Sequence, residues 1–441
     1  MEVIYGCGGD LKPKDAGKVD EPDGNPDGFE PSDINLGDGD INVEDAADEL
    51  GDYGDYPGDW DNGDYLGDWN NGDVTRPQTP PAPQASRFGD APCAFPASLS
   101  YEEASDTLLI TCGGQTNSLF RSSLLSGGGN LSWSKVGDVA GYPSYHLELP
   151  DGYYLVNHSY PDGFTIIDGH TGAVSAQIEF AGLSLLDPEG SGGALLPFAP
   201  NNPAGAILVG GNICLATSNI DVVDYNDPSL TTFHRGTLIC LPYDGSGGVV
   251  AANAVAHYTS AKNPTGMAKI DNETFVVLSS EDYNPDTTDE AALDMFDLST
   301  LNKIPISLGQ ITAQISPQLA ITSGGLVLLG VQKPQAGIKG IDPWAQQPVA
   351  LERDLPEVTN FISGAQAYGP IAVASDFGIF GEGGAILFLD TRSLGWEGLP
   401  ITALDGAPGP SAIVGDRLYQ TVTDKSGASG SVWTLELEDL R

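Results

Sequence analysis

The sequence predicts an all-β fold built from seven copies of one four-stranded unit, preceded by a disordered acidic extension rich in glycine and aspartate. Its 57 glycines and 32 prolines are typical of many turns and short strands rather than long helices. After Cys93, short runs of Leu, Ile, Val and Phe are separated by Gly, Asp and Asn. Related segments recur about every 45 to 55 residues, the length of a four-stranded blade, with one interval near 75. A two-sheet sandwich would not keep one spacing, so we expect a seven-bladed β-propeller over residues 87–441.

The charge of the chain excludes one class of partner. There are 61 acidic and 18 basic side chains, a formal net charge of −43. Because phosphate binding needs a basic patch, we expect no nucleic-acid partner. Like-charge repulsion of this size keeps a protein soluble and suggests a cation-rich environment. No run of about 18 apolar residues is present, so the polypeptide itself is not expected to span a bilayer.

The N-terminal stretch Ile4-Tyr5-Gly6-Cys7 resembles the lipobox of bacterial lipoproteins, in which an aliphatic residue and small residues precede the lipidated cysteine. Tyr5 is bulkier than usual, and only "MEVIYG" precedes Cys7. The resemblance implies that residues 1–7 are the remnant of a signal peptide and that Cys7 is lipidated. The protein would then be exported and held by acyl chains at the outer membrane or cell surface, facing outward or toward the periplasm. The alternative is a cysteine that lies near the terminus by chance.

Residues 8–75 are acidic and of low complexity. Apolar residues there are too scarce to offset the entropy of ordering, so we expect a disordered stalk. Residues 76–86, "RPQTPPAPQAS", form a proline-rich linker that favours polyproline II. Parts of the stalk match the two halves of a calcium loop, with oxygen ligands at alternate positions and glycine at the turn. The candidate calcium ligands are Asp23, Asn25, Asp27, Asp33, Asp38, Asp40 and Asp45. The alternative is a solvated acidic run, so the expected cofactor is calcium or none.

A second part of the stalk, residues 51–73, repeats Gly-Asp followed by an aromatic residue. Its aromatic side chains are Tyr53, Tyr56, Trp60, Tyr65 and Trp69. They could stack on the sugars of a glycan, or they could be weak contact points in a disordered tether.

The repeat is clearest in "NPTGMAKIDNETFVVLSS" (residues 263–280), which is followed by "LDMFDLST" from Leu293. The acids that close equivalent phrases are Asp168, Asp244, Asp297, Asp342, Asp390 and Glu436. This phrase resembles the YVTN-type and WD40-like β-propeller repeat, in which it ends the third strand of a blade. Some relatives of the YVTN-type repeat are lactonases or quinoprotein dehydrogenases, and a propeller enzyme is therefore the alternative function. The last unit stops without a fourth strand, which we expect residues 87–95 to supply, because an uncovered edge invites aggregation.

The five cysteines lack CxxC and zinc-ligand spacing. Beyond Cys7, we expect the disulfides Cys93–Cys112 and Cys214–Cys240, which an oxidising compartment permits. The alternative is four buried thiols that act as small hydrophobes.

The long interval locates insertions at loops between second and third strands, which open on the same face of a propeller as the connections between blades. Residues 218–235 and 280–292 are such loops, and long loops on a rigid scaffold commonly bind partners. The candidate rim residues are Asp221, Asp224, Asp227, Glu281, Asp282, Asp286 and Asp289. They would favour a cation or a basic partner, unless they are solvated loop charges.

No catalytic motif is visible in the sequence. His146 and His158 flank consecutive strands of one blade and could approach each other, although single satisfied histidines are commoner. We therefore expect a cell-envelope lipoprotein that uses its propeller as a binding or scaffold module for a protein or glycan partner.

Overall fold

The computed structural model describes residues 82–440, except 115, 125–130, 223–230, 272, 281–289, 298, 309–318, 332–336, 346, 355–361, 380–382, 393–396 and 399–400. The described residues belong to one compact unit, Thr79–Arg441. Among them, no helix has the length and apolar character needed to cross a membrane.

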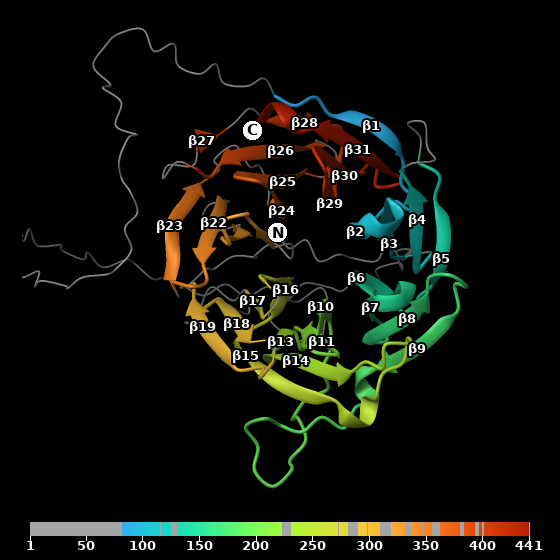
Figure 1. Ribbon diagram of the computed structural model, residues 1–441, viewed down its shortest axis with the longest axis vertical. Coiled ribbons are helices and arrows are strands. Elements are labelled where there is room, and N and C mark those ends of the chain that lie inside the picture. Colours follow the sequence, from blue (N-terminus) through green and yellow to red (C-terminus); the bar gives the residue numbers. More distant parts are fainter. Residues whose placement is uncertain are drawn as a thin grey trace, which may run out of the picture. The chain divides into compact units, whose positions relative to one another are not determined.

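Seven of the eight antiparallel sheets in the described residues are arranged as blades around a central axis, as predicted (Figure 1), and the eighth is a two-stranded hairpin. The blades follow one another along the chain, and the strands of each blade run in order from the axis outward. Blade 1 consists of β2 (Pro96–Glu102), β3 (Thr107–Cys112), β4 (Ser118–Ser123) and β5 (Ser134–Asp138). Blade 2 consists of β6 (Tyr142–Leu149), β7 (Tyr153–Ser159), β8 (Gly163–Asp168) and β9 (Val174–Glu179). Blade 3 consists of β10 (Pro203–Val209), β11 (Asn212–Thr217), β14 (Arg235–Pro242) and β15 (Val255–Lys262).

The next three blades repeat this order. Blade 4 consists of β16 (Pro264–Lys269), β17 (Thr274–Ser279), β18 (Ala292–Asp297) and β19 (Lys303–Ser307). Blade 5 consists of β20 (Ala320–Ile321), β21 (Val327–Val331), β22 (Gly337–Asp342) and β23 (Gln347–Asp354). Blade 6 consists of β24 (Ile362–Tyr368), β25 (Ile371–Ile379) and β26 (Gly383–Asp390), with β27 (Glu397–Gly398) and β28 (Thr402–Leu404) both paired to β26.

Blade 7 closes the ring with strands from both ends of the unit. It consists of β29 (Ala407–Val414), β30 (Arg417–Thr423), β31 (Gly430–Glu436) and, outermost, β1 (Ser86–Asp90). β1 pairs with β31 through Ser86 opposite Thr434 and Asp90 opposite Ser431. The predicted fourth strand is therefore supplied by the start of the propeller.

The hydrophobic core lies between the blades. Both faces of a blade are covered by neighbours, so residues of the second strands are buried on both faces rather than at alternate positions. All six residues of β3 (TLLITC) and of β17 (TFVVLS) are buried. In blade 4 the rings of Phe275 and Phe296 stack at 5.1 Å, in a cluster that includes Cys214 and Cys240 of blade 3.

Both predicted disulfides are present. Cys214 and Cys240 lie directly opposite each other on β11 and β14, with their Cα atoms 4.1 Å apart. Cys93, which follows β1, is joined to Cys112 at the end of β3. The Cys93–Cys112 disulfide therefore ties the closing strand to blade 1. Disulfides are typical of proteins that fold in oxidising compartments.

The acids that close the repeat phrase lie where the third strands end. Asp168, Asp297, Asp342 and Asp390 are the last residues of β8, β18, β22 and β26, and Glu436 is the last residue of β31. Asp244 lies two residues after β14.

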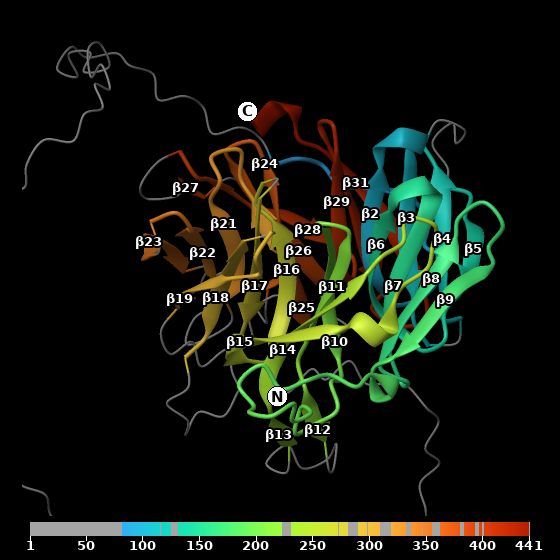
Figure 2. The same ribbon diagram turned by 60° about the horizontal axis from the view of Figure 1, so that its bottom comes forward.

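The chain has two insertions at blade 3, one inside the blade and one directly before it. Between β11 and β14 the chain forms a short hairpin of β12 (Ile220–Val222) and β13 (Thr231–Phe233), which projects from one face of the ring (Figure 2). Residues 180–202, which we call the blade 2–3 connection, join the outer strand β9 to the inner strand β10. Loops between second and third strands and connections between blades end on the same face, so the two insertions meet there.

Candidate functional site

The blade 2–3 connection is fixed to the core by buried apolar side chains. Phe180, at the start of a 3-10 turn (Phe180–Gly182), is 1% exposed, and Leu185 is 3% exposed. Both pack into the cluster between blades 2 and 3. Further along, Leu186 and Leu195 pair as an isolated β-bridge, and their side chains are more than half exposed. A rigid base therefore presents apolar side chains to solvent.

Two adjoining pockets lie along this connection. The first, which we call the apolar pocket, has a volume of about 330 Å³. Its principal lining side chains are Phe180, Leu183, Leu185, Leu195, Leu196 and Phe198. The second, the acidic pocket, has a volume of about 400 Å³ and shares with the first the segment Pro197 to Pro200 and Ala181. Its polar lining side chains are Asp162, Glu179, Asn201, Asp221 and His234.

The polar residues of the acidic pocket come from the turn between β7 and β8, the end of β9, the blade 2–3 connection and the hairpin. Asp162 follows the cis Tyr160–Pro161 bond in the turn between β7 and β8, and its Oδ1 accepts a hydrogen bond of 2.8 Å from the N–H of Asn202. Asn201 joins the connection to the hairpin, because its Oδ1 accepts the N–H of Ile220 at 2.6 Å. Asp221 of β12 lies beside His234, with 2.7 Å between Oδ2 and Nε2. The pocket is thus assembled from blade 2, the connection and the hairpin.

Asp162 is the partly buried carboxylate of this pocket. Burial raises the pKa of Asp162 above its usual value, while the N–H of Asn202 acts in the opposite direction. Among the described residues, no lysine or arginine nitrogen lies within 4 Å of the carboxylates of Asp162 or Glu179. Asp221 thus has His234 beside it, whereas Asp162 and Glu179 lack a lysine or arginine partner in the part of the chain that the structure describes.

Aromatic contacts hold the wall between the two pockets. The ring of Phe198 stacks on that of His234, with centroids 4.9 Å apart and planes 16° apart. The centroid of Tyr258, on β15, lies 6.5 Å from that of Phe198. The guanidinium carbon of Arg235 lies 4.6 Å from the centre of the Tyr258 ring, a cation–π contact. These side chains form a row from the hairpin to the outer strand of blade 3.

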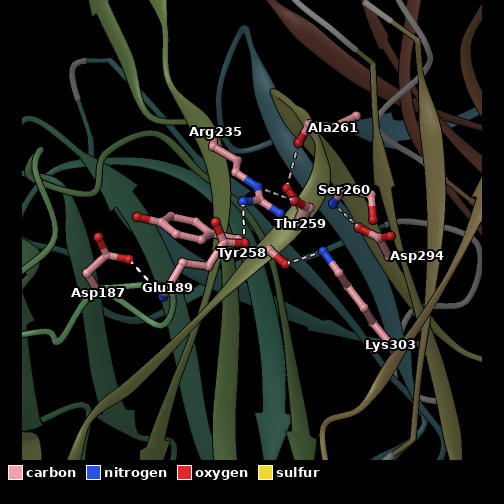
Figure 3. A network of polar contacts seen from close by, with 9 residues as sticks. All are labelled: Asp187, Glu189, Arg235, Tyr258, Thr259, Ser260, Ala261, Asp294 and Lys303. Carbon is pink, nitrogen blue, oxygen red and sulfur yellow. Dashed lines mark hydrogen bonds and ion pairs between the residues drawn. The ribbon is translucent and has the colours of Figure 1, made fainter. Parts of the chain in front are cut away.

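Arg235 fastens the connection to this row (Figure 3). Its Nη1 donates to Glu189 Oε1 at 2.5 Å, and its Nε donates to the carbonyl of Thr259 at 3.0 Å. The Glu189 N–H in turn donates to Asp187 Oδ1 at 3.0 Å. Burial and a hydrogen bond with Asp187 raise the pKa of Tyr258. Arg235 is thus paired with Glu189, and it is not among the residues that line the acidic pocket.

The same network reaches blade 4 (Figure 3). Lys303 Nζ donates to the carbonyl of Tyr258 at 2.7 Å, and Asp294 Oδ2 accepts the N–H of Ser260 at 2.6 Å. Asp294 is completely buried, and burial raises its pKa, while burial lowers the pKa of Lys303. These contacts fix the outer strand of blade 3, and with it the Tyr258 ring that supports Phe198.

The structure places only some of the predicted site residues. Of the rim residues, Asp221 lines the acidic pocket, whereas Asp224, Asp227, Glu281, Asp282, Asp286 and Asp289 lie outside the described residues. Their loops do join second to third strands, in blades 3 and 4, as expected. The lipidation candidate Cys7 and the calcium candidates Asp23, Asn25, Asp27, Asp33, Asp38, Asp40 and Asp45 also lie outside the described residues, as do the stalk aromatics. Within the described ranges, no three His, Cys, Asp or Glu side chains are placed to hold a metal ion.

His146 and His158 lie on the paired strands β6 and β7, but each has other partners. His146 Nδ1 lies 2.6 Å from Ser98 Oγ, and its Nε2 lies 2.5 Å from Ser100 Oγ. His158 Nδ1 lies 2.7 Å from the carbonyl of Pro161. Both imidazoles therefore join parts of the scaffold, His146 between blades 1 and 2 and His158 at the turn that carries Asp162.

Sequence reasoning missed the pockets themselves. It explains the interval of about 75 residues between closing acids by residues 218–235 alone, but the interval also contains the blade 2–3 connection. The segment "LLPFAPNNP" (residues 195–203) carries a usable signal, because apolar residues in a proline-rich loop are unusual unless they are buried or bind something.

Comparison with known proteins identifies the fold. No family model and no curated protein sequence matches the chain. The WD40 repeats of RRP9 are similar in structure, with a TM-score of 0.54 at 9% identity over 82% of this chain and 99% of that one. Hydrazine synthase of Kuenenia stuttgartiensis gives 0.54 at 12% identity over 78% and 96% of the two chains. A chain of the mitotic checkpoint complex gives 0.54 at 10% identity over 83% and 99%. At these identities the likeness concerns the fold alone, and the chain is a seven-bladed β-propeller.

Proposed function

We propose that this protein is a binding or scaffold module that holds a protein partner on the face carrying the blade 2–3 connection. The observation that carries this proposal is the pair of adjoining pockets, one apolar and one acidic, on loops fixed to a rigid ring. Concave sites with apolar walls and a few convergent polar groups are the usual form of binding sites. One similar chain belongs to the mitotic checkpoint complex, so the same fold serves in a protein assembly there.

We further propose that the module is exported and lipid-anchored, at the outer membrane or cell surface. Two disulfides support an oxidising compartment. The lipobox-like stretch ending at Cys7 supplies the anchor in this proposal, and the acidic stalk sets the distance from the membrane. The proposal includes calcium or glycan binding by the stalk, and this part rests on the sequence of the stalk alone.

Site-specific photo-crosslinking in cells of the source organism tests the binding function. A photo-reactive amino acid replaces Ala199, an exposed residue that lines both pockets. A matched variant carries it at Glu273, an exposed residue in the turn between β16 and β17 at the opposite face. We expect discrete protein adducts from position 199 that are absent from position 273. No adduct at 199, or the same adducts at both positions, would contradict the proposal.

A further inference from the structure

We propose that the two pockets recognise an extended cationic segment of the partner, in which an arginine enters the acidic pocket and a neighbouring apolar side chain enters the apolar pocket. This inference rests on the proposed binding function and names the chemistry of its partner.

The charge of the acidic pocket points to a cationic group. The carboxylates of Asp162, Glu179 and Asp221 line it, and His234 is the only basic side chain among its described lining residues. Asp162 is partly desolvated without a lysine or arginine partner in the described ranges. A carboxylate removed from water is stabilised when a positive group pairs with it, so a cation bound here is favoured over a neutral group.

The shape of the wall favours arginine among cations. Phe198 lines both pockets, and the three carboxylates come from different parts of the chain: the turn between β7 and β8, the end of β9, and β12. A planar guanidinium can donate to more than one carboxylate and stack on an aromatic side chain, whereas a lysine ammonium does neither as well. In the same protein, Arg235 already stacks on Tyr258 while it donates to Glu189. A metal ion is disfavoured, because the described residues contain no three acidic, His or Cys side chains close enough to hold one.

The adjoining apolar pocket specifies the neighbour of the arginine. Leu195 lines this pocket and is 59% exposed, and Leu186 across the β-bridge is 56% exposed. Exposed leucines beside a concave apolar surface mark an interaction site. Because the two pockets share the segment around Phe198, one short peptide can fill both with side chains close together in sequence. The acidic stalk of this chain is a poor occupant, because its charge is of the same sign as the pocket.

Peptide binding to the full-length chain tests this inference. The probes are three fluorescein-labelled octapeptides measured by anisotropy at about 150 mM salt, where surface charges are screened beyond about 8 Å. The first contains two arginines and two leucines, the second has glutamates in place of the arginines, and the third has serines in place of the leucines. We expect the first peptide to bind at least about 10-fold more tightly than the other two. The serine peptide controls for unspecific attraction to the stalk, which does not depend on leucine.

Charge-matched variants locate the binding. In one variant, Asp162→Asn and Asp221→Asn remove two charges from the acidic pocket. In the control, Asp271→Asn and Asp439→Asn remove two exposed charges from blades 4 and 7. We expect the pocket variant to bind the arginine–leucine peptide about 10-fold more weakly, and the control to bind it within about twofold of the original chain. In Phe198→Ala, the leucine and serine peptides should bind within about twofold of each other.

Three outcomes overturn the inference: equal binding of the leucine and serine peptides by the original chain, equal binding by the two charge variants, or no binding of the first peptide at about 1 mM. If any of these occurs while protein adducts still form at position 199, the partner chemistry is wrong and the proposed function stands. If the adducts at position 199 are absent as well, both the inference about partner chemistry and the proposed binding function fail.

Discussion

At the scale of single residues, the aspartates that end the third strands act on the backbone. Asp297 Oδ1 accepts the N–H groups of Ser299 at 2.9 Å and Thr300 at 2.8 Å, and the Thr300 hydroxyl at 2.9 Å. These hydrogen bonds lower the pKa of Asp297 to about 2. The side chain thus turns the chain from the third strand toward the fourth, as aspartates commonly do in turns. This requirement explains why the closing acid recurs in a sequence whose other repeat features have drifted.

His146 is a second residue whose role is structural. Its imidazole is buried between blades 1 and 2, with a serine hydroxyl at each nitrogen, so one nitrogen donates and the other accepts. Burial lowers the pKa of His146 from 6.5 to about 4. The neutral form therefore joins the two blades.

We predict that acid weakens the fold through His146. The folded chain binds this proton less readily than the unfolded chain, so stability is complete above pH 6.5 and falls as the pH decreases from 6.5 toward 4. Between pH 7.5 and 4.5, the free energy of unfolding of the original chain should fall by roughly 2 to 3 kcal/mol more than that of His146→Gln. Urea unfolding at both pH values measures this difference. Identical losses in the two proteins would show that folding does not lower the pKa of His146.

At the scale of elements, β1 is the piece on which closure depends. It contributes more than backbone pairing, because the ring of Phe88 meets that of Tyr419 edge-on at 5.6 Å. The carbonyl of Asp90 also accepts the indole N–H of Trp133 at 2.7 Å. Without β1, strand β31 would become an unpaired edge, and such edges promote association.

We predict that a chain beginning at Ala91 self-associates. It retains both disulfides but lacks β1, so the β31 edge is free to pair with another copy. Compared with a chain beginning at Thr79, it should be destabilised by at least about 2 kcal/mol and elute at a larger mass. Urea unfolding and size exclusion with light scattering provide the measurements. A stable monomer would mean that β1 is dispensable for closure.

The elements differ in how far the sequence predicts them. The number of blades and the cystine pairs follow from local patterns, because the strands recur at a regular spacing along the chain. The closing strand follows because a closed ring has only one place for a missing strand. Cys214 and Cys240 could be paired on this basis, since they occupy corresponding places on neighbouring strands. The pockets could not be predicted, because Phe198, His234 and Asp162 come from three loops without a shared period. Their meeting depends on the angle between blades 2 and 3, which no local pattern encodes.

At the scale of the whole molecule, a strongly acidic chain carries a small apolar pocket on its propeller. The net charge of −43 suppresses self-association and draws cationic partners toward the protein. In the binding mode that we propose, the two pockets then select among those partners, because one of the pockets takes an apolar side chain. Long-range attraction and short-range selection are thus separated in this protein.

We predict that Cys7→Ser, expressed with a complete export signal, releases the protein from membranes. In the proposed anchoring, acyl chains on Cys7 hold the protein in the bilayer, so a variant that cannot be acylated loses its anchor. Fractionation should move most of the protein from the membrane pellet to the supernatant, and Cys93→Ser should not do so. Unchanged membrane association of the Cys7 variant would contradict lipid anchoring.

The way the ring is clasped determines how it bears a mechanical load. A force that pulls on the N-terminal extension enters the propeller along β1 and is resisted first by the pairing of β1 with β31. If that pairing shears open, the load reaches Cys93, and the disulfide passes it to Cys112 on a buried strand of blade 1. Unravelling is therefore arrested covalently before β2 can be drawn out, and blades 2 and 3 keep their arrangement under tension.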